Sequence, residues 1–231
     1  MAIDPQTSGL RSAPGRAHVL VVGVLLIVMT IELVLLAIDQ NWMHVALVVA
    51  VMATMLAPII ARDRLPVDVP SEMQVPAVLF IFATLFLGEV RDYYARFWWW
   101  DLALHTTAGL MLGLLGLLVT YVLNQGELSR FRMRPAFIAL FAFFFSVGLG
   151  ALWEIFEFAM DRIFGLTMQK PMAGDPSGLT DTMWDLIVDT IGALFVSIVA
   201  WRYMRRTRRP YIDDWARRLI ERNPRLFRPG P

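Results

Sequence analysis

The chain has no cysteine among its 231 residues. Disulfide bonds, thiolate metal ligands and cysteine nucleophiles are therefore excluded. Charge is also scarce, because Asp, Glu, Lys and Arg make up 18% of the residues, whereas about a quarter is usual in soluble domains. Hydrophobic residues make up 57% of the chain, and the mean hydropathy is +0.56. This composition favours a membrane protein over a soluble one.

The apolar residues gather into runs long enough to cross a bilayer, which takes about 20 residues of helix. We predict an all-α, polytopic membrane protein with six transmembrane helices in one bundle. The first run is too long for the apolar region of a signal peptide and lacks a small-residue cleavage site, so we expect it to be retained. The expected spans are 18–38, 43–61, 75–96, 101–123, 136–161 and 183–203.

Three regions follow from the distribution of polar residues. Residues 1–17 are polar and contain proline and glycine, which is typical of a disordered tail. Residues 18–203 are the expected transmembrane domain, and residues 204–231 are a strongly basic tail.

The basic tail contains one amphipathic stretch. Ile212, Trp215, Leu219 and Ile220 share a helical face, and Arg217, Arg218 and Arg222 lie elsewhere on the helix. We expect an interfacial helix on the anionic cytoplasmic leaflet. Nucleic-acid binding is a poor alternative, because the basic patch directly follows a membrane span.

The distribution of basic residues predicts the orientation. Of the 21 Lys and Arg residues, 17 fall in the N-terminal tail, the second and fourth loops and the C-terminal tail. The other side of the membrane receives only Arg91, Arg96, Arg162 and Lys170. Since basic residues concentrate on the cytoplasmic side, both termini are expected to be cytoplasmic.

Eight acidic residues and one histidine lie within or beside the apolar spans, all toward the non-cytoplasmic side. They are Glu89, Asp101, His105, Glu154, Glu157, Asp161, Asp181, Asp185 and Asp189. A carboxylate in hydrocarbon is energetically costly, so such groups usually face the protein interior and carry function. Their convergence predicts a shared polar site at the outer ends of spans three to six.

The spacing of these residues places them on common helix faces. Asp101 and His105 are four residues apart, and the three aspartates of the sixth span repeat at the same interval. The three acids of the fifth span follow at i, i+3 and i+7. Gly109 lies one turn after His105, Gly150 one turn before Glu154, and Gly192 just past Asp189. Small residues let membrane helices approach closely.

Acids this close together require neutralisation by protons or by cations. Oxygen ligands with at most one imidazole suit hard or borderline divalent ions, so we expect Mg, Mn, Ca, Zn or Fe, held by the nine residues. The spacing matches neither the Glu-x-x-His pairs of di-iron bundles nor the His-Glu-x-x-His of zinc proteases. The identity of the metal therefore stays open.

Several of these residues also have structural alternatives. Asp181 could cap the sixth helix. Asp161 could pair with Arg162 or Lys170, and Glu89 could pair with Arg91 or Arg96. A lone histidine is often only a satisfied polar residue, but an aspartate one turn from His105 favours a ligand or an acid/base. A purely structural network of salt bridges and shared protons is the overall alternative.

The longest outer connection, 165–180, is expected to lie over the site as a lid. Gln169 and Lys170 in this loop are candidate contacts to a phosphate or lipid headgroup.

The order of motifs resembles the YjdF-like bacterial inner-membrane family over roughly residues 75–200. The motifs are Gly-Glu at 88–89, Trp-Asp-x-x-x-His at 100–105, Trp-Glu-x-x-Glu at 153–157, Asp-Thr-x-x-Asp-Leu at 181–186 and Gly-Ala at 192–193. That family is a domain of unknown function. The resemblance implies a multi-pass protein of the bacterial inner (cytoplasmic) membrane and a site, but no activity.

A looser similarity is to VanZ-like proteins, in which an acid is followed by Gln and then by Asp-x-x-x-Asp/Asn before Gly. Gln169, Asp181, Asp185 and Asp189 stand at those places, with Asp189 where Asn would be expected. VanZ-like proteins are linked to glycopeptide resistance at the cell envelope.

Three functions remain open. The first is a metal-dependent enzyme that hydrolyses or transfers a group on a membrane lipid or lipid-linked substrate, with His105 as general acid/base steered by Asp101. The second is a cation or proton transporter, although the inner halves of the last spans offer little beyond Thr120, Tyr121 and Ser197. The third is an accessory or assembly subunit, partnered by a second copy or another membrane protein.

Overall fold

The computed structural model describes residues 16–60, 71–125, 133–206 and 211–223. These ranges are helical apart from short connections and one isolated bridge between Met172 and Asp175. The predicted all-α class is confirmed. Most of the predicted disordered tail lies outside the described residues, and so does the end of the basic tail.

The chain divides into two compact units. The first unit comprises Met1–Tyr93 and Arg218–Pro231, and the second comprises Tyr94–Arg217. The second unit contains the last three expected spans and eight of the nine predicted site residues.

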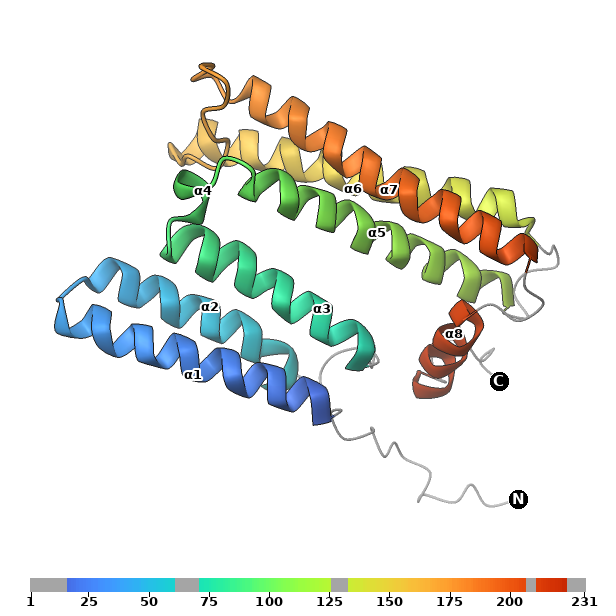
Figure 1. Cartoon of the computed structure of the whole chain (residues 1–231), viewed down its shortest axis with the longest axis horizontal. Helices are drawn as coiled ribbons and strands as arrows, with labels where there is room; N and C mark the ends of the chain where they lie inside the picture. Colours follow the sequence, from blue (N-terminus) through green and yellow to red (C-terminus); the bar gives the residue numbers. More distant parts are fainter. Residues whose placement is uncertain (1–15, 61–70, 126–132, 207–210, 224–231) are drawn as a thin grey trace. The chain divides into compact units, whose positions relative to one another are not determined.

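The first unit contains three apolar helices packed side by side (Figure 1). They are α1 (Arg16–Ile38), α2 (Trp42–Ile60) and α3 (Ser71–Ile81), which continues into the π-helical segment η2 (Phe82–Val90). Their core is formed by buried apolar side chains: Val22, Met29, Val48, Val51, Met55, Val78, Phe86 and Val90. An ion pair of 2.7 Å joins Arg91 Nη1 to Glu32 Oε1.

The third span was expected to run from 75 to 96, but the observed helix ends earlier, at Val90. The Arg91 amide donates to the Phe86 carbonyl at 2.9 Å, and Asp92 adopts the left-handed conformation with φ 61°. That conformation breaks the helical path. A separate short helix, α4 (Tyr93–Arg96), follows.

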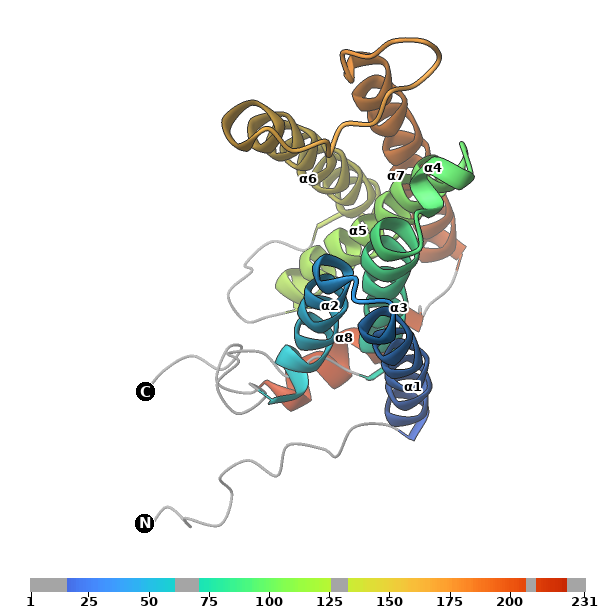
Figure 2. The same cartoon turned by 90° about the vertical axis from the view of Figure 1, so that its left-hand side faces the viewer.

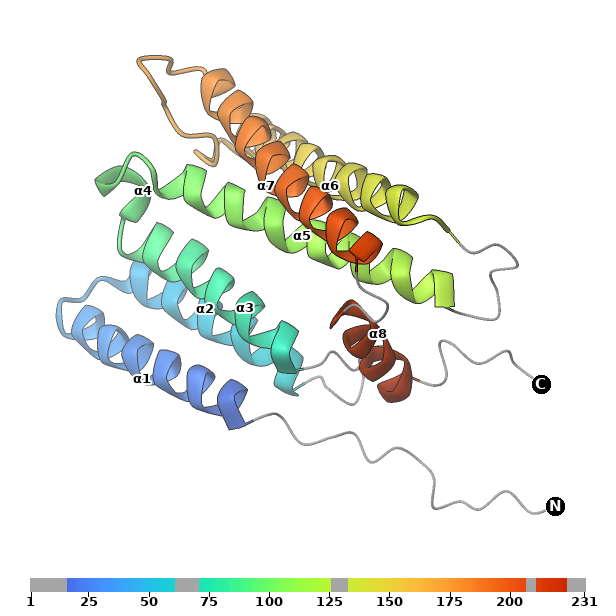
Figure 3. The same cartoon turned by 45° about the vertical axis from the view of Figure 1, so that its right-hand side comes forward.

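The second unit contains three long helices, α5 (Trp100–Gln125), α6 (Pro135–Phe164) and α7 (Leu179–Arg206). Each of them contacts the other two, and they run alternately up and down, as Figures 1 and 3 show. Pro135 begins α6, where its missing N–H costs no hydrogen bond. Gly165, with φ 66°, ends α6. The start of α5, the end of α6 and the start of α7 therefore meet at one end of the unit.

Glycines bring the three helix backbones close together. A Cβ on Gly192 would lie 2.6 Å from the Thr106 carbonyl oxygen, and a Cβ on Gly109 would collide with the Asp189 carbonyl. Ser146 Oγ of α6 donates to the Gly109 carbonyl of α5 at 2.9 Å. The backbones of α5 and α7, and those of α5 and α6, thus pack closely beside the predicted site.

Among the described residues, four helices are long and apolar enough to cross a membrane: His18–Ile38, Trp100–Asn124, Pro135–Phe164 and Leu179–Arg206. Two shorter apolar helices, Trp42–Ala57 and Gln74–Val90, match the second and third expected spans. The six-span count and the cytoplasmic position of both termini stay predictions. A helix, α8 (Tyr211–Arg222), forms in the basic tail, and its predicted place at a membrane surface also stays a prediction.

Replacing Gly192 by alanine is expected to lower the melting temperature of the detergent-purified protein. The new methyl group would press on the α5 backbone at Thr106 and Leu110, which cannot turn away as a side chain can. Overpacking of this kind costs about 1–3 kcal/mol. Gly148→Ala on α6 is the matched control, because nothing lies within 4 Å of its Cβ position. Equal melting temperatures for the two variants would contradict this account of the packing.

Candidate metal centre

The His105 imidazole lies among four carboxylates. Its Nε2 atom is 3.8 Å from Asp101 Oδ1 and 3.9 Å from Asp185 Oδ2. Its Nδ1 atom is 3.4 Å from Asp189 Oδ2 and 3.8 Å from Glu154 Oε1. Each ring nitrogen therefore faces two acidic side chains, and all three long helices of the second unit contribute.

Helical periodicity explains how the sequence builds this cluster. Asp101 and His105 occupy successive turns of α5, so they share the face that turns toward α7. Asp181, Asp185 and Asp189 occupy successive turns of α7 in the same way. Because the two helices pack closely, the two faces meet along more than one turn.

The carboxylates of α7 are fully enclosed by the protein. Asp185 is 0% exposed, and neither of its oxygens has a hydrogen-bond partner among the described residues. One oxygen of Asp181 and one of Asp189 are likewise buried and unpartnered within that part of the chain. Burying an ionised carboxylate without a partner is costly, so such groups bind a cation or take up a proton.

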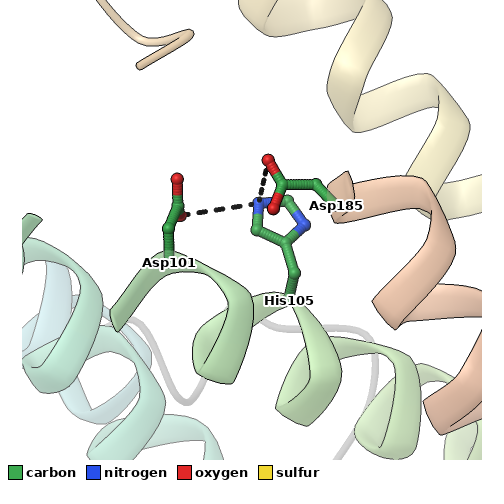
Figure 4. A group of neighbouring side chains, drawn as sticks. All are labelled: Asp101, His105 and Asp185. Atoms are coloured by element: carbon green, nitrogen blue, oxygen red, sulfur yellow. Dashed lines mark ion pairs between the residues drawn. The ribbon is translucent and has the colours of Figure 1, made fainter. Parts of the chain in front are cut away.

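Asp101, His105 and Asp185 form a group with the dimensions of a cation site. Each offers one ligand atom, and these atoms lie within 4.8 Å of one another. Figure 4 shows the two carboxylates and the imidazole pointing toward a common centre from α5 and α7. Oxygen ligands lie about 2.0–2.6 Å from Mg²⁺ or Ca²⁺, so ligands on opposite sides of such an ion are about 4–5 Å apart. This buried Asp/His group could therefore bind a metal.

Asp161 lies at the edge of the site, and both of its carboxylate oxygens already accept hydrogen bonds. Its Oδ1 accepts the Met168 amide at 2.7 Å, and its Oδ2 accepts the Gln169 amide at 2.9 Å. In the structure it fixes the start of the loop that follows α6. Glu157, one turn earlier and buried, accepts the indole N–H of Trp153 at 2.9 Å.

The loop 165–178 is tied to the first turn of α7, and Figure 2 shows it joining α6 to α7 at the near end. The Lys170 amide donates to Asp181 Oδ2 at 2.6 Å, and Gln169 Nε2 donates to Thr182 Oγ1 at 2.8 Å. The Lys170 ammonium donates to the Thr167 carbonyl and lies 5.0 Å from the centre of the Tyr94 ring. The predicted lid thus rests against the acidic residues, while the substrate contacts of Gln169 and Lys170 stay predictions.

Asp175 caps the loop and the start of α7. This role was not predicted from the sequence. Its carboxylate accepts the Ser177 amide, the Thr180 amide and the Thr180 hydroxyl, at 2.9, 3.1 and 2.8 Å. Hydrogen bonds from Ser177 and Thr180 hold the pKa of Asp175 below its ordinary value. The stabilisation is therefore present above the unfolded-state pKa and is lost only as the pH falls through the lower, folded-state pKa. An aspartate two residues before a serine and just before a helix was the available signal.

Glu89 is the predicted site residue that does not belong to the second unit. It lies on η2 of the first unit and is exposed. Its membership of the site stays a prediction.

Ser146, in contrast, was not predicted, although it lies two turns before Glu154 and so on the same face of α6.

Comparison with known proteins places the chain in a family. Residues 21–206 match the family described as "Predicted membrane protein (DUF2238)". The chain belongs to this family. The match agrees with a multi-pass membrane protein, and the family description names no reaction.

An uncharacterized protein of Thermotoga maritima is 28% identical over 137 residues. The matched part covers 58% of this chain and 65% of the relative, so it spans slightly less than two thirds of the relative's length. No solved structure matches the chain.

Replacing Asp161 by alanine is expected to speed hydrogen exchange at the Met168 and Gln169 amides, because both lose their acceptor. Hydrogen–deuterium exchange of the purified protein, read on peptides covering 166–171, measures the effect. Asp214→Ala is the control, since its carboxylate pairs with Arg217 on α8. Unchanged exchange in the Asp161 variant would show that the loop is held by other contacts.

Proposed function

We propose that this membrane protein holds a divalent metal ion between Asp101, His105 and Asp185, and uses it for hydrolysis or group transfer on a lipid or lipid-linked substrate. One observation carries the proposal: the fully buried Asp185 carboxylate, unpartnered among the described residues, faces the Nε2 atom of His105. A cation between them would neutralise the acids and use the free nitrogen lone pair.

Asp189 is proposed to orient His105. Its Oδ2 is the nearest carboxylate oxygen to Nδ1, and metal-bound histidines commonly donate their other ring N–H to a carboxylate. The position of this oxygen is restricted by packing, because a Cβ on Gly150 would lie 2.6 Å from it. A proton held on Nδ1 by Asp189 leaves Nε2 free for the metal.

The carboxylates around the ion are proposed to carry protons in the reaction. Asp101 Oδ1 and Asp185 Oδ2 lie on the Nε2 side of His105, whereas the buried Glu154 lies 3.8 Å from Nδ1, on the opposite side of the ring. A bound divalent ion would make a water ligand more acidic and polarise a phosphoryl or carbonyl oxygen. In hydrolysis, the water oxygen would bond to that phosphorus or carbon while one of its protons passes to a neighbouring carboxylate of the cluster. The bond to the leaving oxygen would then break, and the same carboxylate would return the proton to that oxygen.

A lipid substrate is favoured by the surroundings of the site. Glu154 and Glu157 lie on a membrane-length helix between exposed apolar side chains of α6, among them Ile155, Phe156 and Phe158. A substrate with acyl chains can reach such a site from within the membrane. The resemblance to YjdF-like and VanZ-like proteins agrees with a role in the bacterial inner membrane, and the distribution of basic residues favours a site on the non-cytoplasmic side.

Transport is less well supported than chemistry on one side of the membrane. Beyond Asp189, the buried hydroxyl groups of Ser146 and Thr120 donate to backbone carbonyls of α5. Residues 106–125 of α5, 135–153 of α6 and 190–206 of α7 include no aspartate or glutamate, so no carboxylate is available there to balance the charge of a passing ion.

The metal content of the purified full-length protein tests the proposal. Inductively coupled plasma mass spectrometry should find about one ion per chain after loading with Mn²⁺ or Zn²⁺ and desalting. Asp185→Asn should lose the ion, and Asp189→Asn should weaken its affinity by about 10–100-fold. Asp175→Asn is the matched control and should keep the ion, because its carboxylate binds loop groups. Equal metal content in wild type and Asp185→Asn would refute the site.

His105→Ala separates two roles of the histidine. As a ligand, its loss should remove both the ion and the turnover of phospholipid in detergent micelles. The alternative role, general acid/base beside a metal held by carboxylates alone, predicts that the ion stays while turnover disappears. Turnover equal to that of wild type would exclude both roles.

A further inference from the structure

A basic hollow lies at the other end of α7 from the metal centre. Trp201, Arg202, Arg205 and Arg206 line this hollow, whose volume is about 370 Å³. The Arg205 guanidinium carbon lies 5.1 Å from the centre of the Trp201 ring, a cation–π geometry. Stacking restricts the guanidinium and so organises its hydrogen-bond donors before any ligand arrives.

The position of the hollow along α7 corresponds to a membrane surface. Trp201 follows Asp181 by twenty residues in one continuous helix, which spans about 30 Å. This is the thickness of the hydrocarbon core of a bilayer. Tryptophan is enriched where the hydrocarbon meets the headgroups. With α7 crossing the membrane as predicted, the three arginines that accompany Trp201 would lie at headgroup level, in the leaflet opposite the metal centre.

The arginines of the hollow have no carboxylate partner among the residues that the structure describes, unlike Arg91 with Glu32 and Arg217 with Asp214. Guanidinium groups bind phosphate through paired, charge-assisted hydrogen bonds. The C-terminal end of a helix carries partial negative charge and would not attract an anion by itself. Anion binding at this place must therefore come from the arginines.

We propose that the basic hollow binds the phosphate group of an anionic phospholipid. A lipid is favoured over a free phosphate because the turn before the hollow exposes Ile198 and Val199, and apolar side chains there can contact acyl chains. This site is independent of the metal centre, and it is a defined site, unlike the diffuse attraction of a basic tail to an anionic leaflet.

Native mass spectrometry of the full-length protein in detergent tests the proposal, with dimyristoyl phosphatidylglycerol and the matching phosphatidylcholine as probes. Wild type should retain phosphatidylglycerol in preference to phosphatidylcholine. Arg205→Gln should reduce the retained phosphatidylglycerol by about tenfold, the size expected for losing hydrogen bonds between charged groups. Arg205→Lys, which keeps the charge and loses the planar group, should give an intermediate loss.

Arg217→Gln is the matched control, because it removes the same charge from the basic tail outside the hollow. Retention in this variant should equal that of wild type. Equal losses in the Arg205 and Arg217 variants would show diffuse attraction and overturn the proposal. Binding of inorganic phosphate without retention of phosphatidylglycerol would assign the hollow to a soluble anion. Retention should be unchanged by EDTA, and a loss on chelation would contradict its independence from the metal centre.

Discussion

The cost of burying several carboxylates around His105 is the constraint on which the second unit depends. Asp185 and Glu154 lie within helices of membrane length, where water is not at hand to solvate a charge. His105 can neutralise one acid at most, yet four carboxylates lie within 4 Å of its ring. The remaining acids must therefore bind a cation or take up protons, and the cluster could hold a metal.

Close helix packing makes this concentration of charge possible. Gly109 and Gly192 let α5 and α7 touch through their backbones beside Asp189, and Gly150 leaves room for the Asp189 carboxylate against α6. Asp161 and Asp181 hold the loop that covers this end of the unit. Small residues, acids and loop thus act together, since the acids can converge only if the helices approach, and the loop packs over the acids at this end.

The helices and most of the site could be predicted from the sequence because both depend on local geometry. Asp101 with His105, and Asp185 with Asp189, are each one helical turn apart, so helix formation alone puts them on one face. The path of the loop could not be predicted in this way. The capture of two loop amides by Asp161 depends on a chain reversal begun by Gly165, and the end of the third apolar helix depends on the left-handed Asp92. Residue spacing does not encode these features.

The most direct measurement of the central claim is the anomalous diffraction of Mn²⁺ in crystals of the full-length protein. We expect a peak within ligand distance of Asp101 Oδ1, His105 Nε2 and Asp185 Oδ2, and we expect this peak to be absent from Asp185→Asn crystals. Density without such a peak at saturating Mn²⁺, with Asp185 hydrogen-bonded directly to His105 or to another acid, would contradict the account and show a proton-sharing network instead.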